Sequence, residues 1–436
     1  MSETVPSGWA RVRIGDVCDV VGGSTPRTGI ADNWGGDVSW VTPDDLSRHE
    51  GTYIRQGRRS LTQLGYESCS ATLMPRGAVV FSSRAPIGYV AIASGPVCTS
   101  QGCKSFVPLE GLLSEYLYWY LRHATPGIQA MGTGTTFKEI SKATASSIQL
   151  VVPPFSEQGR IVVAIEEHFS RLDAAEATLR SAERKCQALT KSVVINAIPR
   201  GVPTDWQVKS VAETGETGLG RQRSPKYHSG TNMKPYLRVA NVFEDRIDAT
   251  DVMQMHFDEA DFERFRLRSG DVLLNEGQSP ELLGRPAIYR GEPPDVAFTN
   301  SLIRFVPKPG VTSEWALLVF RRHMHAGRFQ QESRITTNIA HLALGRFRTV
   351  EFPVPPLEVQ ERVVASTRLT LDAVDRQVDQ IDREIAAIRS LRRAVLTAAF
   401  SGRLVPQDPT DEPASVLLER IAASRLAKSV RRRRTA

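Results

Sequence analysis

Two carboxylates lie close together in the stretch GDVLLNEGQ, which runs from Gly270 to Gln278. Asp271 and Glu276 could hold a divalent metal ion in the manner of a nuclease strand pair, with Gln278 where such sites carry a lysine. The attacking water in such a site needs a third polar group to organise it, and the similar stretch RGAVVFSSR, which begins at Arg76, has no acids at all. We therefore predict that catalysis is absent, and keep a single-chain metal-dependent DNA nuclease as the alternative.

Other signatures of catalysis are missing from the sequence. No Gly-Lys dipeptide occurs, which excludes a Walker A phosphate loop. The GTG at Gly132–Gly134 is not followed by the third glycine of a dinucleotide fingerprint. VPPF at Val152–Phe155 is similar to the motif with which amino-methyltransferases hold a flipped base, but valine offers no acceptor in place of their Asn or Asp. The sequence favours a binding protein, without a bound metal or cofactor.

Composition allows two or three domains and a polyanionic partner. The chain has 436 residues, 41% of them hydrophobic, with 55 Lys and Arg against 48 Asp and Glu. The resulting net charge of +7 suits nucleic acid. No apolar run approaches the roughly 18 residues of a membrane span, and the start of the chain lacks the apolar stretch of a secretory signal. We expect a cytoplasmic protein whose five cysteines, which form no CxxC pair, are reduced.

The clearest pattern is a repeat: VPPFSEQGRIV begins at Val152, and VPPLEVQERVV begins at Val354. Each copy opens a segment without interior proline and rich in helix-forming residues, so two helices of about forty residues, or roughly 60 Å, are predicted. The second carries a seam with strict 3-4 spacing, at Leu371, Val374, Val378, Ile381, Ile385 and Ile388. The first repeats every seven residues, at Ile165, Leu172, Leu179, Cys186 and Val193. Because such stripes must be covered, we expect the two helices to form an antiparallel coiled-coil-like pair.

A second layer of the repeat is globular. Each half begins with a tryptophan and alternating apolar residues, continues with a hairpin pattern and ends with a Thr-rich loop before a short helix and a strand. The matching stretches are Gly8–Cys18 and Thr204–Thr214, Leu73–Ile92 and Leu267–Tyr289, and Gly132–Ser141 and Ser333–Leu342. Two copies of one plan suit a partner with two-fold character, such as duplex DNA.

The fold class predicted from these patterns is α+β, with two pseudo-repeated mixed α/β domains separated by the long helices. The expected boundaries are domain 1 at 1–153, the first helical region at 154–203, domain 2 at 204–355, the second helical region at 356–406, and a C-terminal helix with a basic tail at 407–436. That last helix could complete the scaffold or touch a partner, and its arginine run could lie on phosphates or be a solubilising tail.

Several stretches together resemble the DNA-specificity subunit of type I restriction-modification systems. They are WARVRIGDVCDVVGGSTPRT with NWGGDVSWVTPDDL, GTGTTFKEI, the twice-used VPP…Q…R(I/V)V followed by LDA, and AVLTAAFSGRLVP. The resemblance covers essentially the whole chain and lies in the order of globule, helix, globule, helix. The first helical region departs modestly, because its seam is less regular and it ends in AIPRGVP.

The resemblance implies that each globule is a target recognition domain that reads one half of a bipartite DNA sequence. It also implies that the paired helices measure the unread spacer and dock two adenine methyltransferase subunits, which motor-nuclease restriction subunits join. S-adenosylmethionine, ATP and magnesium would then belong to those partners, and none to this chain. A coiled-coil scaffold that does not bind DNA remains an alternative.

Polar loop residues are the candidates for DNA contact, because Arg suits guanine while Asn and Gln suit adenine. In domain 1 they are Ser82, Ser83, Arg84, Gln101, Lys104, Thr135, Thr136 and Lys138. In domain 2 they are Asn275, Gln278, Ser279, Asn300, Arg334, Thr336 and Asn338. Gly22–Pro26 is expected to be a turn that positions domain 1 rather than a reader.

Overall fold

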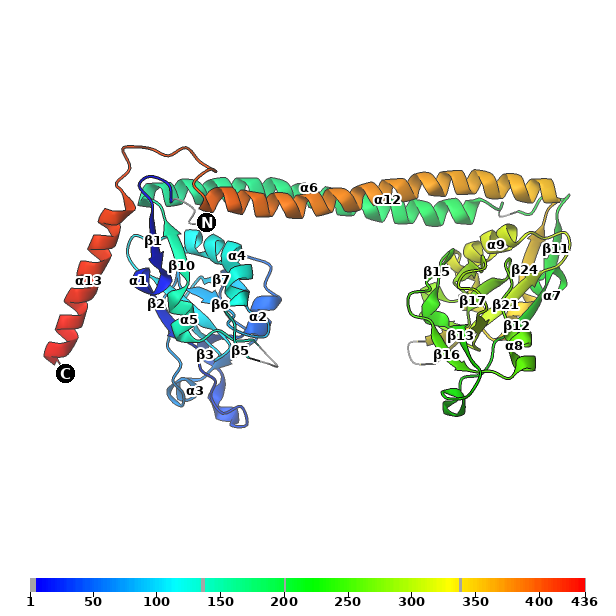
Figure 1. Ribbon diagram of the computed structural model, residues 1–436, viewed down its shortest axis with the longest axis horizontal. Coiled ribbons are helices and arrows are strands. Elements are labelled where there is room, and N and C mark those ends of the chain that lie inside the picture. Colours follow the sequence, from blue (N-terminus) through cyan, green and yellow to red (C-terminus); the bar gives the residue numbers. More distant parts are fainter. Residues whose placement is uncertain (1–4, 135–137, 200, 337–338, 436) are drawn as a thin grey trace. The chain divides into compact units, whose positions relative to one another are not determined.

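The computed structural model describes residues 5–134, 138–199, 201–336 and 339–435, and leaves out the side chains of 334–336, 339 and 428–435. The chain divides into two compact units (Figure 1). Unit 1 is Met1–Thr178 with Ile385–Ala436, and unit 2 is Leu179–Glu384. Each unit therefore contains one globular domain and a part of both long helices.

The globular domain of unit 1 is built on a mixed five-stranded sheet and a smaller three-stranded one. The larger sheet has the order β2 (Cys18–Gly22), β9 (Lys104–Pro108), β6 (Val79–Phe81), β7 (Val90–Ala93) and β4 (Tyr53–Ile54). The smaller has the order β5 (Arg59–Leu61), β3 (Trp34–Val41) and β8 (Cys98–Thr99). A separate ladder joins β1 (Ala10–Arg13) to β10 (Gln149–Val152), and α4 (Ser114–Ala130) contributes most of its buried side chains to the core beside the larger sheet.

Unit 2 repeats this plan. Its larger sheet has the order β12 (Gly215–Leu219), β21 (Leu302–Pro307), β17 (Val272–Asn275) and β19 (Pro286–Ile288). Its smaller sheet has the order β16 (Met253–His256), β13 (Met233–Leu237) and β20 (Ala297–Phe298), and β11 (Gln207–Ser210) pairs with β24 (Glu351–Val354). In both small sheets the central strand has one antiparallel and one parallel neighbour. The prediction of two repeated α/β domains is confirmed, including the hairpins β6–β7 and β17–β19.

The long helices α6 (Phe155–Asn196) and α12 (Leu357–Phe400) begin directly after the two Pro-Pro pairs and lie side by side within each unit (Figure 1). In unit 1, Arg392 of α12 binds Asp173 at 2.6 Å and Glu176 at 2.8 Å on α6. In unit 2, Cys186 lies 3.8 Å from the side-chain oxygen of Gln377. Since later residues of α6 meet earlier residues of α12, the pairing is antiparallel, as predicted.

Burial along the helices follows the predicted seams. On α12, every seam residue is buried except Val378, which is half-buried. On α6, Ile165 and Cys186 are buried, while Leu172, Leu179 and Val193 are half-buried. The first helix therefore has the less regular seam, in agreement with its more polar sequence.

The hydrophobic core of each unit includes the end of a long helix, which in unit 1 comes from a distant part of the chain. In unit 1 the ring of Phe400, at the end of α12, lies 5.5 Å from Tyr116, 5.1 Å from Tyr120 and 5.2 Å from His123. In unit 2, Val194 near the end of α6 and Ile198 just after it join the core around α9 (Ser313–His325). The globular domains and the helix pair thus share their hydrophobic cores.

The C-terminal helix α13 (Ala414–Thr435) packs against the globular domain of unit 1 (Figure 1). The amide of Ala414 donates to the carbonyl of Gly8 at 2.8 Å, and Leu417 and Ile421 are buried one and two turns later. Arg425 then donates to the carbonyls of Gly15 at 2.6 Å and Cys18 at 2.8 Å. Of the two roles expected for this helix, completion of the scaffold is therefore the one that the structure supports.

The cysteines are free thiols, four of them buried and Cys69 half-buried. Burial raises the pKa of Cys98 and of Cys103 to about 12, so neither is a thiolate at neutral pH. Among the described residues, no helix combines the length and the apolar character needed to cross a bilayer.

The shared core predicts that Phe400→Ala destabilises unit 1 by about 3 kcal/mol, because it removes a large buried ring and leaves a cavity. Leu391→Ala is the matched control, since Leu391 lies on the same helix but is 52% exposed, and it should cost less than about 0.5 kcal/mol. Urea unfolding followed by tryptophan fluorescence measures both variants. Equal effects would show that the helix end is not part of the core.

Candidate nucleic-acid interface

In unit 1 the three predicted segments meet at one edge of the domain. Ser82, at the end of β6, bridges Cys103 just before β9. Two residues further, Arg84 bridges Glu139, and Glu139 also bridges Thr133 on the other side of the Thr-rich loop. The hairpin loop, the segment around 101–104 and the Thr-rich loop are therefore neighbours.

Unit 2 has the same arrangement, with longer strands. β18 (Gly277–Gln278) pairs with β23 (Ile339–His341), which pairs with β22 (Arg334–Thr336). The equivalence extends to single hydrogen bonds. Ile140 donates to the carbonyl of Ser83 at 3.1 Å in unit 1, and Leu342 donates to that of Glu276 at 2.8 Å in unit 2. We call this feature the reading edge of each unit: residues 82–84, 101–104 and 138–139 in unit 1, and 275–279, 300 and 339–341 in unit 2.

The two reading edges carry different charges at equivalent positions. In unit 1, Glu139 binds Lys104 at 3.3 Å and Arg84 at 3.5 Å, so one carboxylate lies between two cations. In unit 2 the position of Glu139 is taken by His341, whose ring nitrogen lies 3.2 Å from the carboxylate of Glu276. Sequence reasoning did not select Glu139 or His341, although both lie within the Thr-rich stretches that it paired. The two edges therefore offer different hydrogen-bonding groups to a ligand.

Three of the predicted contact residues are fully buried in this structure. Ser82 donates its hydroxyl to the carbonyl of Pro86 at 2.8 Å, and Ser83 donates to that of Gly102 at 3.0 Å. The side-chain amide of Asn275, which occupies the position of Ser82 in unit 2, donates to the carbonyl of Val242 at 3.4 Å. Their exposure is 0%. These side chains therefore connect backbone segments of the edge.

The remaining candidates differ in exposure. Gln101, Lys138 and Asn300 are exposed, and Arg84, Gln278 and Ser279 are half-buried. Lys104 is largely covered, with its side chain 13% exposed. Thr135, Thr136 and Asn338 lie outside the described residues, as do the side chains of Arg334 and Thr336.

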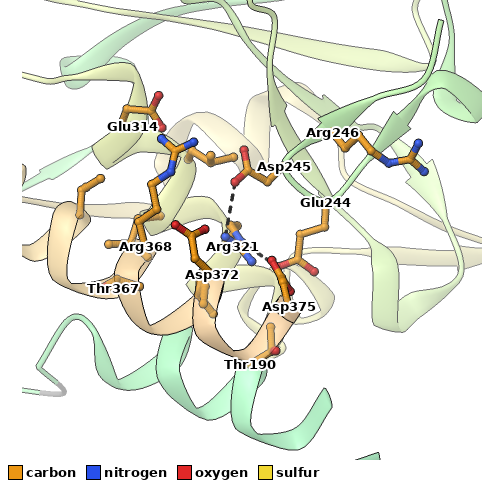
Figure 2. Close-up of a pocket in the computed structure, with 14 residues that line it drawn as sticks. Thr190, Glu244, Asp245, Arg246, Glu314, Arg321, Thr367, Arg368, Asp372 and Asp375 are labelled. Carbon is orange, nitrogen blue, oxygen red and sulfur yellow. Dashed lines mark hydrogen bonds and ion pairs between the residues drawn. The ribbon is translucent and has the colours of Figure 1, made fainter. Parts of the chain in front are cut away.

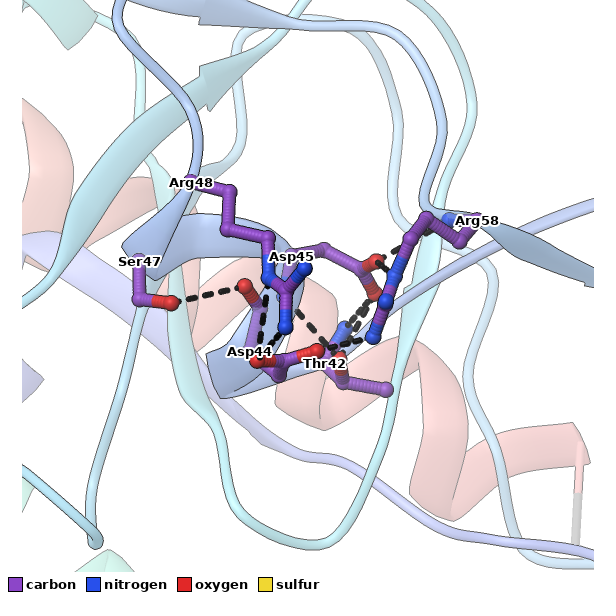
Figure 3. A network of polar contacts seen from close by, with 6 residues as sticks. All are labelled: Thr42, Asp44, Asp45, Ser47, Arg48 and Arg58. Atoms are coloured by element: carbon purple, nitrogen blue, oxygen red, sulfur yellow. Dashed lines mark hydrogen bonds and ion pairs between the residues drawn. The ribbon is translucent and has the colours of Figure 1, made fainter. Parts of the chain in front are cut away.

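A network of ion pairs and hydrogen bonds borders the reading edge of unit 1 at the start of α2 (Pro43–Ser47) (Figure 3). Gly102 joins the two features, because a Cβ there would lie 2.8 Å from the ring of Pro43 and 3.3 Å from Nε of Arg84. Asp45 accepts from the amide of Thr42 at 2.9 Å and from the amide of Arg58 at 3.0 Å. Two exposed guanidinium groups, those of Arg48 and Arg58, are held by Asp44. The network thus fixes two surface arginines beside the edge.

Asp45 is the centre of this network, with only 7% of its side chain exposed. Burial acts to raise its pKa, but the hydrogen bonds from Thr42 and Arg58 outweigh burial and hold the pKa of Asp45 below its usual value. Thr42 and Asp45 also form a capping box at the start of α2. The T-x-x-D spacing is visible in the sequence, so this feature could have been found there.

In unit 2 an amide replaces the carboxylate. Asn241 accepts from the amide of Arg238 at 3.0 Å, and its amide group donates to the carbonyls of Asp248 at 3.0 Å and Asp251 at 2.9 Å. The turn is the same, but its centre is uncharged. Arg238, which is half-buried at the start of this turn, pairs with Asp251.

The geometry contradicts the nuclease alternative. Asp271 and Glu276 lie at opposite ends of β17, five residues apart and therefore roughly 16 Å along the strand. Asp271 is buried and accepts from the amide of Arg268 at 3.0 Å, while Glu276 faces His341. Among the described residues no group of three potential ligands could hold a metal ion.

A polar hollow of about 440 Å³ lies elsewhere in unit 2, between α9, α12 and the turn that contains Glu244 and Asp245 (Figure 2). Arg321 binds Glu244 at 2.7 Å and Asp245 at 3.7 Å, and His325 binds Glu244 at 2.8 Å. Burial raises the pKa of Asp245, whereas the bonds from His325 and Arg321 offset burial and keep the pKa of Glu244 low. These ion pairs brace the turn against α9, and none of the reading-edge residues lines the hollow.

We expect Asp45→Asn to cost about 1 kcal/mol of stability at neutral pH, because an amide cannot replace all the bonds that the cap accepts. A carboxyl whose pKa is lowered by folding stabilises the fold above its unfolded pKa of about 3.9, and this contribution disappears as the pH falls through its folded pKa. Thermal unfolding at pH 7 and pH 3 should therefore show a difference from the parent chain that shrinks in acid. Asp44→Asn is the control, since Asp44 is half exposed; a difference that is independent of pH would contradict the account.

Comparisons with known proteins agree with this architecture. The family described as "Type I restriction modification DNA specificity domain" matches twice, at residues 6–183 and 203–389. The type I restriction enzyme MjaIX specificity subunit of Methanocaldococcus jannaschii is 31% identical over 254 residues, which are 55% of this chain and 59% of the relative. The EcoKI specificity subunit of Escherichia coli is 20% identical over 97% of both chains.

Solved structures show the same fold. A chain of a type I R-M system, from a study of its complex assembly and conformational transition, has a TM-score of 0.71 at 19% identity and covers 92% of this chain and 99% of its own. The HsdS subunit from Thermoanaerobacter tengcongensis has a TM-score of 0.55 at 20% identity with the same coverage. Two matches of the family, one for each repeat, together span most of the sequence, and the chain therefore belongs to the type I restriction modification DNA specificity domain family.

Proposed function

We propose that this chain is the DNA-reading subunit of a type I restriction-modification complex, and that each unit reads one half of a bipartite duplex target with its reading edge. The observation that carries the proposal is the repeated edge itself, in which three separate polar segments converge at the same place in both units. Base edges in the major groove are read by such side chains, while exposed cations on phosphates supply affinity without sequence information.

The exposed and half-buried members of the edges are the proposed contacts. Arg84 has the bidentate donors that suit guanine, and Gln101, Gln278 and Asn300 have the paired donor and acceptor that suit adenine. Lys138, which is exposed at the end of the Thr-rich loop, suits a phosphate. Because Glu139 and His341 occupy equivalent positions, the two units should read different half-sites, so the target is asymmetric.

The helix pair is proposed to dock two adenine methyltransferase subunits, which motor-nuclease subunits join. S-adenosylmethionine, ATP and magnesium would act in those partners and not in this chain, which contributes sequence recognition. The protein would work in the cytoplasm, where the host DNA is accessible.

Exchange of residues 1–150 for the corresponding domain of another specificity subunit should change one half of the methylated motif. The other half and the spacer should stay the same, because unit 2 and the helix pair are untouched. Base-modification sequencing of a host that carries the complete system, before and after the exchange, measures the motif. A change in both halves would refute modular reading.

Two single substitutions should separate base reading from phosphate binding. Arg84→Ala should relax the requirement for one base pair of a half-site and weaken specific binding by about 10- to 100-fold, because a bidentate base contact is lost. Lys138→Ala should weaken binding to all sequences alike and reduce the slope of log affinity against log salt by about one. Binding of the complex to specific and random duplexes at several salt concentrations measures both; identical behaviour of the two variants would contradict the assignment.

A further inference from the structure

Each long helix has a glutamine in its first turn, six residues after the valine of the Val-Pro-Pro motif. These residues are Gln158 in α6 and Gln360 in α12, and both are 0% exposed. A buried side-chain amide has two donors and an acceptor that must find partners within the protein. The partners of these two amides therefore show what the glutamines hold together.

In unit 1, Gln158 ties the start of α6 to the loop before α4. Its side-chain oxygen accepts from the amide of Leu113 at 2.9 Å. Its nitrogen donates to the carbonyl of Gly111 at 3.0 Å and to that of Pro153 at 3.3 Å. The globular domain is thus joined to its long helix by directional bonds to backbone groups.

In unit 2, Gln360 makes the same set of bonds. Its oxygen accepts from the amide of Thr312 at 3.0 Å. Its nitrogen donates to the carbonyl of Gly310 at 2.8 Å and to that of Pro355 at 2.9 Å. The three partners occupy positions equivalent to those of Leu113, Gly111 and Pro153 in unit 1. The same set of hydrogen bonds therefore occurs in both units.

One further hydrogen bond, made by another residue, accompanies those of each glutamine, although its donor differs between the units. The hydroxyl of Tyr116 donates to the carbonyl of Val151 at 2.8 Å in unit 1. The indole of Trp315 donates to the carbonyl of Pro353 at 2.8 Å in unit 2. The first turn of α4 or α9 is thereby tied to the strand that leads into the long helix. We call the two bonded sets the joints of units 1 and 2.

We propose that Gln158 and Gln360 are positioning residues that fix the orientation of each globular domain on its long helix, and that this orientation sets the spacer length that the complex accepts. The inference rests on the proposed function. Apolar contacts are non-directional and allow one surface to roll on another, whereas hydrogen bonds weaken steeply when their angles change. The joints therefore contribute the directional part of the attachment.

The spacer is sensitive to this orientation because of the geometry of the duplex. One additional base pair between the half-sites moves the second half-site by about 3.4 Å and rotates it by about 35°, since B-DNA has 10–10.5 base pairs per turn. A domain that is held rigidly on its helix cannot follow both displacements. A domain whose joint is loosened can follow them in part.

Gln158→Met tests the joint, because methionine has a similar length and fills the same space without hydrogen bonds. The measurement is base-modification sequencing of a host that carries the complete complex, scored as methylation at spacers one base pair shorter or longer relative to the normal spacer. We expect this ratio to rise at least tenfold, with the half-site bases unchanged, and Gln360→Met should have the same effect. Gln187→Met is the matched control, since Gln187 is exposed on α6, and it should leave the ratio unchanged.

Loss of methylation at all spacers in equal proportion would overturn the proposal, because a purely structural role predicts that result. If a variant gives no methylation at all, amide hydrogen exchange of the purified chain shows whether the substitution has loosened the joint. Gln158→Met should speed exchange at Leu113 and leave Thr312 protected, and unchanged exchange at Leu113 would refute the joint. If the parent complex methylates no bipartite motif, the proposed function itself fails, which is a different outcome from an unaltered spacer ratio.

Discussion

The architecture depends on one constraint: the hydrophobic core of each globular domain includes residues of both long helices, α6 and α12. The end of α12 enters the core of unit 1, and the end of α6 enters the core of unit 2. Helix pairing and domain folding are therefore not independent, because a helix end cannot be removed without opening a core. Within each unit, the pairing of the two helices therefore also supports the core of the globular domain.

This constraint separates the parts of the chain that can vary from those that cannot. The reading edges lie where strands β6 and β17 end, and the side chains proposed to contact DNA there are exposed or half-buried. Substitution of such side chains changes few buried contacts, so the specificity of a unit can change at little cost in stability. Ser82, Ser83 and Asn275 are different, because their buried polar atoms bind backbone groups on which the shape of the edge depends.

The parts of the fold that sequence predicted are those governed by local periodicity. The 3-4 spacing from Leu371 to Ile388 predicts a helix with one buried apolar face, whichever part of the protein covers that face. The hairpins are predicted by the strand patterns around glycine. The burial of Ser83 could not be predicted from the sequence, because its hydroxyl binds the carbonyl of Gly102, which is distant in the sequence. The role of Gln158 was likewise invisible, although the glutamine stood in the repeated motif, because its partners lie in the loop before α4.

The two units also show how one fold accommodates different surroundings. In unit 1 the carbonyl of Gly15 accepts from Arg425 of α13. In unit 2 the equivalent carbonyl, that of Ala212, accepts from Lys308 at 3.1 Å, a residue of the domain itself. A side chain therefore donates to this backbone carbonyl in both units, although the donor comes from α13 in unit 1 and from the domain itself in unit 2. The two units can therefore share a pattern of hydrogen bonds while their surfaces differ, which is compatible with the proposed reading of two different half-sites.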